Sequence, residues 1–495
     1  MLSLNRIFSL NWLTLLALFF YLFTAYKSSG YNNADEHYQI IEFANYKLGF
    51  AQKEDLAWEF HDQIRSSLQP VVCFMIFKAA GYLGANDPHT LAFILRVITA
   101  VLLIVIIRYF ILSSQRFIEQ KNLFGYFILS FFIWYLPYIN VRFSSETWSG
   151  AFILLSIAIV IKRKHIPTML YAITVGCVLG LAILFRYQSA IIAGSLIIWL
   201  FFNGTKIKHV ATVISSISIV LLIGALFDRW FYGEFCFTLY NYFYVNIVKD
   251  VASQYGVSPW YGIILYVIKS PGPFGILIFI SYIAVAVKQP KHILIWVSLH
   301  YLIIHSIIPH KELRFLFPLA NLTPLVMILG YQSLKPTIIV KQKVAQLTVI
   351  VLIFLNIAGL LALNFRGAGL ARISVSQFIA QNYAGKNIQI IYVGDSNPYW
   401  DWAIPKNTFY YNKNVSAKEV ASIWKDDLKN WMIKGKTNLL ILSPDDITGP
   451  RAEQMLKDSG LKKVFQSIPD YALFINRFYN EDINRSSLLI YEFNR

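Results

Sequence analysis

The sequence predicts a polytopic α-helical membrane protein with a small α/β domain at its carboxyl end. Of its 495 residues, 56% are hydrophobic and only 14% are charged, whereas soluble domains average about 25% charged residues. The hydrophobic residues form long uninterrupted runs, which is the pattern of membrane-spanning helices. From about residue 365 the runs become shorter, and the composition becomes that of a water-soluble domain.

We interpret about eleven of the apolar runs as membrane spans, although some fall short of the ~20 residues that a bilayer requires. The predicted spans are 8–26, 91–112, 123–139, 147–161, 167–185, 188–202, 209–227, 260–287, 292–308, 315–331 and 345–364. A further run, 71–83, is short and contains Lys78, so it is either a twelfth span or a helix against the membrane. The first run lacks a small-residue cleavage site, which favours a retained span over a signal peptide.

The loops between the runs indicate the orientation of the spans. Every second loop is rich in Lys and Arg, and the positive-inside rule places these loops in the cytoplasm. Their cations are Arg108, Arg116, Lys121, Lys162, Arg163, Lys164, Lys206, Lys208, Lys288, Lys291, Lys335, Lys341 and Lys343. The alternation holds if the run 71–83 does not cross, which favours eleven spans. The net charge of +17 therefore reflects membrane orientation and gives no reason to expect a nucleic-acid partner.

We divide the chain into a transmembrane module, 1–364, and a soluble extracytoplasmic α/β domain, 365–495. The domain is expected to contain strands at 388–393, 439–442 and 471–475, with helices between them. One of these helices would begin at the capping box Ser416-Ala417-Lys418-Glu419. The three cysteines, Cys73, Cys177 and Cys236, are scattered, so they indicate neither a disulfide framework nor a metal site.

The first outer loop, 27–90, contains two adjacent acids, Asp35 and Glu36. Apolar residues recur at helical spacing after them, so an amphipathic helix is expected to begin near Asp35, and a second helix after Trp58. As a structural alternative, Asn33 is the N-cap and Glu36 completes a capping box. The functional alternative makes Asp35 a general base at the water–lipid boundary, because capping explains Glu36 better than it explains Asp35.

A second group of charged residues, His310-Lys311-Glu312-Leu313-Arg314-Phe315, lies at an outward span end, where Lys and Arg are usually scarce. These cations either snorkel to the interface or hold an anion such as phosphate, for which Arg offers a planar fork and Lys a point charge. Arg142, Glu146 and Arg186 lie at other outward span ends, where a charge is more often a snorkelling anchor than a ligand.

Taken in order, Ala34-Asp35-Glu36-His37-Tyr38-Gln39, Trp58-Glu59-Phe60, Ile64-Arg65-Ser66 and His310–Phe315 resemble glycosyltransferase family 22. This family comprises the mannosyltransferases of the GPI-anchor and N-glycan pathways, which have the GT-C fold. The His-Lys-Glu-x-Arg-Phe segment is the specific part. The resemblance extends to about residue 330 and includes the aromatic-rich stretch 255–262.

The resemblance implies an inverting transferase that moves mannose from a polyprenyl-phosphate carrier to a hydroxyl of a lipid-linked or other extracytoplasmic glycan. By this resemblance Asp35 is the catalytic base and Glu36 its neighbour. The implied donor phosphate ligands are His310, Lys311, Arg314 and, as an auxiliary contact, Arg65. Weaker substrate contacts are Glu312, Trp58, Arg142, Arg186, Tyr255 and Trp260. Neither a metal nor another cofactor is expected.

Two other functions remain open. A transporter or flippase for lipid-linked sugar would need ionisable residues along a path through the spans, whereas the charges here collect at outward ends. A GT-C transferase of another sugar would share the fold and differ in pocket detail. The expected partners are the bilayer, the lipid-linked sugar and a glycan acceptor. The membrane is either the bacterial inner membrane or the endoplasmic reticulum, with the active site on the non-cytoplasmic side.

Overall fold

A computed structural model describes residues 2–162, 168–335, 342–364, 367–368, 372–399, 407–421, 423, 428–447, 454, 456, 458–476 and 487–493. The chain divides into two compact units. Unit 1 contains Met1–Phe23, Asp62–Val72 and Arg96–Leu360, and unit 2 contains Thr24–His61, Cys73–Leu95 and Leu361–Arg495. Most of the predicted outer loop thus belongs to the same unit as the carboxyl-terminal tail. The unit boundary at Leu361 lies near the predicted domain boundary at 364.

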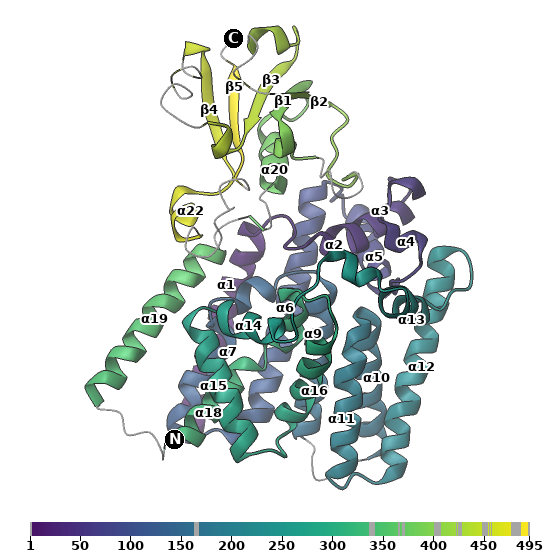
Figure 1. The fold of residues 1–495 in the computed structure, drawn as a ribbon, viewed down its shortest axis with the longest axis vertical. Helices are drawn as coiled ribbons and strands as arrows, with labels where there is room; N and C mark the ends of the chain where they lie inside the picture. Colours follow the sequence, from purple (N-terminus) through teal and green to yellow (C-terminus); the bar gives the residue numbers. More distant parts are fainter. Residues whose placement is uncertain are drawn as a thin grey trace. The chain divides into compact units, whose positions relative to one another are not determined.

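Unit 1 is helical (Figure 1). Its helices follow the apolar runs of the sequence. Helices α1 (Leu2–Lys27), α5 (Leu68–Tyr82), α6 (Pro88–Ser114) and α19 (Gln342–Asn364) contribute residues to both units. The other main helices are α7 (Leu123–Phe132), α8 (Leu136–Ile139), α9 (Ser145–Lys162), α10 (Met169–Phe185), α11 (Ala190–Phe202), α12 (Ile207–Tyr232), α13 (Thr238–Phe243), α14 (Gly262–Lys269), α15 (Pro273–Lys288), α16 (Ile293–Ile307), α17 (Phe317–Ala320) and α18 (Thr323–Leu334).

The helices are those of a multi-pass membrane protein. Among the described residues, five helices are long and apolar enough to cross a membrane, or up to seven if each of two bent pairs is one span. The pair α14–α15 bends by 119°, and the pair formed by Leu313–Ala320 and α18 bends by 72°. Pro273 at the start of α15 accounts for the first break, because proline cannot continue a helix from the preceding turn. The count of eleven spans and their orientation stay predictions.

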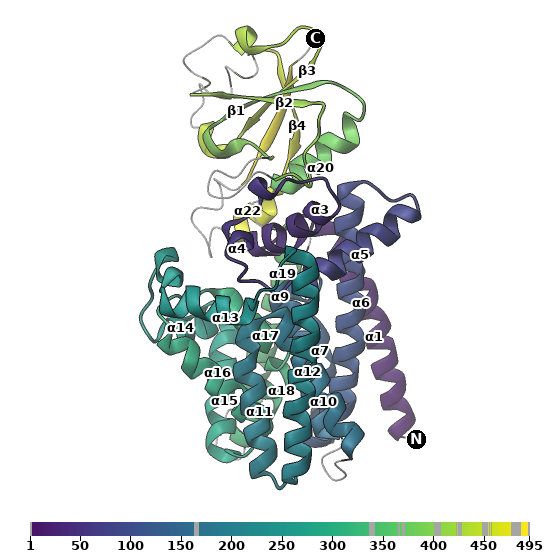
Figure 2. The same ribbon diagram turned by 90° about the vertical axis from the view of Figure 1, so that its right-hand side faces the viewer.

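Small residues allow close packing between α10 and α12, which lie side by side in both ribbon views (Figures 1 and 2). A Cβ atom on Gly176 would lie 2.5 Å from the carbonyl oxygen of Val213, and one on Gly180 would lie 2.7 Å from Val220. Two glycines four residues apart on one helix let the backbones approach, as is common between membrane helices.

A similar contact joins α9 to α17. A Cβ atom on Gly150 would lie only 2.8 Å from the Cα atom of Pro318, so only glycine fits here without a shift of the backbone. Glu146 lies one turn before Gly150, and Arg314 lies one turn before Pro318. The close approach at Gly150 therefore brings the two charged residues together.

Unit 2 contains a five-stranded sheet with strand order β2-β1-β3-β5-β4. Strands β1 (Ile388–Val393), β2 (Val415–Val420) and β3 (Thr437–Leu442) are parallel, whereas β5 (Leu489–Phe493) is antiparallel to β3 and β4 (Leu461–Gln466) is antiparallel to β5. Helix α20 (Arg372–Asn382) supplies Val375 and Ile379 to the hydrophobic core on one face of the sheet. The carboxyl-terminal part of the chain thus contains a small sheet, and the strands predicted at 388–393 and 439–442 are confirmed. The division into a transmembrane module and a soluble extracytoplasmic domain stays a prediction.

Two predictions for this domain are wrong. The segment Ser416–Glu419 is part of strand β2 and does not begin a helix, because its residues pair in parallel register with Gln389–Tyr392 of strand β1. The run 471–475 lies in helix α22 (Asp470–Asn476). A five-residue apolar run fits a short buried strand and a short buried helix equally well, so its periodicity could not decide.

Candidate active site

Asp35 and Glu36 lie in the first turn of an irregular helix in unit 2. Helix α2 (Ala34–Glu36) continues through a π-helical turn, His37–Ile41, into α3 (Glu42–Lys47). The predicted N-cap is confirmed, because Asn33 is extended and its side-chain oxygen accepts from the backbone N–H of Asp35 at 3.1 Å. The predicted helix from Asp35 is also confirmed.

The two acids differ in their surroundings. The Glu36 side chain is buried, and its Oε2 accepts a hydrogen bond of 2.8 Å from the backbone N–H of Asn32, one residue before the expected position. Asp35 is half-buried. Glu36 therefore holds the turn closed, whereas Asp35 stays partly accessible from outside the helix. A π-turn such as the one that follows is often found at functional sites.

Glu42 joins this helix to a segment of the tail that lies in the same unit. It is 2% exposed, and its Oε1 accepts from the backbone N–H groups of Thr408 and Phe409, both at 2.9 Å. The Thr408 hydroxyl donates to Oε2, and His37 Nε2 lies 2.9 Å from Oε1. The His37 ring stacks on Tyr410 at 5.4 Å. One buried carboxylate thus fixes the position of the helix that carries Asp35.

These bonds predict an acid-sensitive contribution to stability. Burial raises the pKa of Glu42, but bonds from His37, Thr408 and Phe409 outweigh it, so the pKa lies below the usual 4.5. A lowered folded-state pKa adds stability that is complete above the unfolded-state value and is lost as the pH falls through the folded-state value. We expect Glu42→Gln to remove this component when unfolding of the full chain is followed by tryptophan fluorescence from neutral pH downward.

The exposed acid Glu54 of the same unit provides the control, and Glu54→Gln should leave the acid limb unchanged. If the stability of Glu42→Gln falls with acid as steeply as that of the wild type, the carboxylate does not carry this component.

Unit 1 contains a network of buried and partly buried charged side chains. Arg186 Nη1 lies 2.7 Å from Glu146 Oε1, and Arg314 Nη1 lies 3.5 Å from the same oxygen. Arg314 also donates to both oxygens of Glu312 through Nε and Nη2, each at 2.7 Å. His310 Nε2 lies 3.0 Å from Glu312 Oε1. Residues from three separate predicted outer loops therefore meet in one place.

Three of the charged residues that could have been interface anchors are buried. Arg142, Glu146 and Arg186 are 1%, 3% and 4% exposed, so their charged groups lie inside the protein and do not snorkel to its surface. The Arg142 guanidinium lies 5.1 Å from the ring centre of Tyr138. Buried charges in membrane proteins are costly and usually mark a functional site.

Lys311 has a different environment from its neighbours. Its ammonium donates to the carbonyl oxygens of Ile308 at 2.6 Å, Ser258 at 3.0 Å and Pro309 at 3.4 Å. An ammonium group has three N–H donors, so these bonds use all of them. Burial also lowers the pKa of Lys311. Through its bond to Ser258, Lys311 holds the aromatic-rich loop that follows Gly256. Its role toward phosphate stays a prediction.

Arg65 lies in the short part of the outer loop that belongs to unit 1. Its guanidinium carbon lies 5.7 Å from the ring centre of Tyr242, and its carbonyl oxygen accepts from Tyr232 at 2.7 Å. The buried Asp228 accepts from the N–H and hydroxyl of Ser67, each at 2.7 Å. This carboxylate fixes the turn that presents Arg65.

The remaining candidates are less enclosed. Tyr255 and Trp260 are 61% and 67% exposed, although the Tyr255 ring approaches that of His310 with 6.3 Å between centroids. Trp58 is half-buried at the start of α4 (Trp58–His61), the helix that was expected there. Asp35, Glu36 and Trp58 belong to unit 2, and every other predicted site residue belongs to unit 1.

The carboxylates Glu42 and Asp228 were not predicted to matter, and Glu146 was predicted only as an anchor. The sequence pattern that could have identified Asp228 and Glu146 is an acidic residue at the end of an otherwise apolar helix. Among the described residues, no group of three His, Cys, Asp or Glu side chains could hold a metal ion. The absence of a cofactor stays a prediction.

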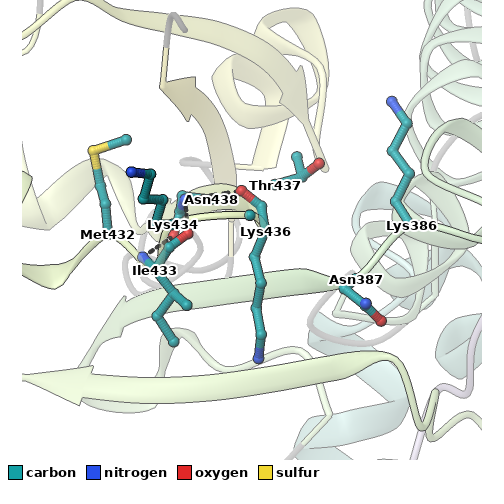
Figure 3. Close-up of a pocket in the computed structure, with 9 residues that line it drawn as sticks. Lys386, Asn387, Met432, Ile433, Lys434, Lys436, Thr437 and Asn438 are labelled. Atoms are coloured by element: carbon teal, nitrogen blue, oxygen red, sulfur yellow. Dashed lines mark hydrogen bonds between the residues drawn. The ribbon is translucent and has the colours of Figure 1, made fainter.

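Unit 2 also has a pocket of about 630 Å³ at the edge of its sheet where β1 and β3 begin (Figure 3). Its lining includes Lys386, Lys434 and Lys436. Lys436 does not point freely into the pocket, because its ammonium donates to Ser416 at 2.7 Å. None of the predicted site residues lines this pocket, and it is not part of the candidate site.

Known proteins resemble the chain in sequence. The family model of the Alg9-like mannosyltransferase family matches residues 12–398. GPI mannosyltransferase 3 of Candida albicans is 28% identical over 311 residues, which cover 61% of this chain and 60% of that protein. GPI mannosyltransferase 3 of Debaryomyces hansenii is 26% identical over 347 residues, covering 66% and 59%. The chain thus spans about 60% of the length of these curated relatives.

Two solved structures share the fold. ArnT from Cupriavidus metallidurans bound to undecaprenyl phosphate aligns with a TM-score of 0.55 and 10% identity, covering 97% of both chains. An oligosaccharyltransferase from Archaeoglobus fulgidus, in complex with Zn and sulfate, aligns with a TM-score of 0.50 and 11% identity, covering 90% of this chain and 69% of that one. Both are GT-C enzymes, and at these identities the similarity concerns the fold alone.

Proposed function

Because the chain belongs to the Alg9-like mannosyltransferase family, we propose that it transfers a mannosyl residue from a polyprenyl-phosphate carrier to a hydroxyl of a glycan acceptor. The acceptor is a lipid-linked or other glycan on the non-cytoplasmic side of the membrane. The names of the relatives, which are GPI mannosyltransferases, support a glycolipid acceptor.

The observation that carries this proposal is the buried network around Glu146. Arg186 and Arg314 share this carboxylate, and Arg314 also holds Glu312 through two bonds. A buried guanidinium group, that of Arg186, and a largely shielded one, that of Arg314, can stabilise a phosphate that gains negative charge as it leaves. The bound lipid phosphate named for ArnT supports a donor of the same chemical class for this chain.

The proposed reaction is a single displacement with inversion. Asp35 takes the proton of the acceptor hydroxyl as its oxygen bonds to C1 of the mannosyl group. The bond from C1 to the phosphate oxygen breaks, and the phosphate monoester leaves with the electron pair toward Arg314 and Arg186. No acid is needed, because the leaving phosphate is stable as an anion. Glu36 and Glu42 position the base through the bonds that close its turn and hold its helix.

A donor competition experiment tests the proposed function. The full-length protein in membrane vesicles is given polyprenyl-phosphate-linked mannose, glucose or arabinose, each radiolabelled, with a mannosylated glycolipid acceptor. We expect label to enter the acceptor at least about tenfold faster from the mannose donor, because pocket contacts to sugar hydroxyls discriminate strongly.

The same vesicles distinguish transfer from transport. If the labelled lipid changes leaflet without label entering any acceptor, the protein is a transporter. If arabinose or glucose is transferred faster than mannose, the protein is a transferase of another sugar.

A further inference from the structure

His305 is a buried histidine near the end of α16 that the proposed mechanism does not use. Its side chain is 2% exposed, and its ring lies 4.0 Å from that of Tyr301 and 5.8 Å from that of Phe315. Ionisable residues inside a membrane helix are rare and usually functional. An aromatic residue without nitrogen atoms would fill this space equally well, so packing alone does not explain a histidine here.

The hydrogen bond of one ring nitrogen fixes the state of the other. Nδ1 lies 2.9 Å from the carbonyl oxygen of Tyr301. A carbonyl oxygen only accepts, so Nδ1 carries a proton, and in the neutral ring Nε2 is then an acceptor with a lone pair. Nε2 is buried and has no hydrogen-bond partner among the described residues. A buried acceptor without a donor is unfavourable and calls for an explanation.

His305 lies in the candidate site, because the ring of Phe315 joins it to the buried charges. The guanidinium carbon of Arg186 lies 5.2 Å from the centre of this ring, and that of Arg314 lies 5.8 Å from it. The ring of His310 lies at 5.8 Å. His305 therefore shares one aromatic side chain with the residues proposed to receive the phosphate.

We propose that His305 Nε2 accepts a hydrogen bond from a hydroxyl group of the transferred sugar or of the acceptor sugar. The inference rests on the proposed function and deepens it, because it assigns a contact that recognises the sugar. A phosphate oxygen is excluded as the partner, since it would bring a second lone pair to Nε2. A sugar hydroxyl is a neutral donor that fits a buried acceptor.

The neighbouring Arg186 supports the choice of a hydroxyl. Its Nε is also buried and has no hydrogen-bond partner among the described residues, although Nη1 pairs with Glu146. The two side chains around Phe315 thus offer one unused acceptor and one unused donor. A hydroxyl group both donates and accepts, so a sugar with several hydroxyls can satisfy both.

Three substitutions of His305 separate the two ring nitrogens and the packing. In His305→Gln the longer amide can place its oxygen near the Nε2 position, whereas His305→Asn ends near Nδ1 and lacks the acceptor. His305→Phe keeps the ring contacts and lacks both nitrogens. We expect Asn and Phe to lower kcat/KM for transfer by about ten- to a hundredfold and Gln to restore most of the activity.

His300 provides a matched control. It lies on the same helix, and its Nδ1 makes the same type of bond, to the carbonyl oxygen of Trp296 at 2.8 Å, but it is only half-buried. We expect His300→Asn to transfer at the wild-type rate. If His305→Asn and His305→Phe also transfer at the wild-type rate, the proposed contact does not exist.

Substrate analogues identify the hydroxyl. Polyprenyl-phosphate mannose analogues and acceptor analogues, each lacking one hydroxyl, are compared in the wild type and in His305→Asn. One analogue lacks the hydroxyl that bonds to Nε2. With this analogue the wild type should transfer more slowly than with the complete substrate, whereas His305→Asn should transfer both at the same rate. The two losses do not add, because both changes remove the same contact. The identity of this analogue tells whether donor or acceptor supplies the hydroxyl. If every analogue costs both proteins the same factor, the inference is overturned.

Binding of polyprenyl-phosphate mannose, followed by tryptophan fluorescence, separates this inference from the proposed function. A wild type that binds the donor without transferring mannose contradicts the proposed function. The dissociation constants of the donor analogues and of the acceptor analogues then decide the role of His305 by the same comparison. A wild type that neither transfers nor binds the donor overturns both.

Discussion

Replacing Asp35 by Asn is expected to lower the turnover number for mannosyl transfer by about 10²–10⁴-fold, the usual contribution of a general base. The amide cannot take the proton of the acceptor hydroxyl. The fold should persist, because the N-cap bond at this turn uses the backbone N–H of Asp35 and not its side chain. The measurement is transfer from polyprenyl-phosphate mannose at saturating donor, with thermal unfolding as a check on folding.

The adjacent acid supplies the matched control. In Glu36→Gln the amide oxygen can still accept the N–H of Asn32, so the turn should stay closed and turnover should remain near that of the wild type. If Glu36→Gln is inactive and Asp35→Asn is active, the two acids have the opposite roles. If both variants turn over normally, the base lies elsewhere.

Replacing Arg314 by Ala is expected to lower kcat by about 10²–10³-fold, the typical effect of removing one group that stabilises transition-state charge. The substitution removes the fork that holds Glu312 and the second partner of Glu146. Arg314→Lys should recover little, because an ammonium does not reproduce the planar fork. The measurement is kcat and KM for polyprenyl-phosphate mannose in membranes that contain equal amounts of each protein.

The exposed Lys249 in the same unit provides the control for net charge, and Lys249→Ala should leave kcat unchanged. An Arg314→Ala variant with kcat within about twofold of the wild type would show that this guanidinium does not stabilise the leaving phosphate. In that case Arg186 is the next candidate.

Much of the fold was accessible from the sequence, because long apolar runs have few alternatives to helices. The breaks within runs 260–287 and 315–331 were not predicted. Each run contains proline residues, but its mean hydropathy is high, so it was interpreted as one continuous helix. In the tail, the runs at 388–393 and 439–442 were recognised as strands by their buried apolar character. Strands β4 and β5 were missed. In β4 the charged residues Lys462 and Lys463 interrupt the run of apolar residues.

The candidate site was only partly predictable. Local rules identified the turn at Asn33 and the helix after it, since capping depends on neighbours within four residues. The partners of Glu42 could not be inferred, because Thr408 and Phe409 lie 366 and 367 residues away. The meeting of Glu146 with Arg314 also depends on helix packing at Gly150, which the sequence does not reveal by itself.

The most direct test of the central claim uses the purified full-length protein in liposomes with polyprenyl-phosphate mannose and a glycolipid acceptor. The released polyprenyl phosphate, the mannose on the acceptor and the anomeric configuration of the new bond are measured together. The account predicts one polyprenyl phosphate released for each mannose transferred, with inverted configuration, and loss of both products in Asp35→Asn. Retained configuration, or transfer without release of polyprenyl phosphate, would contradict it.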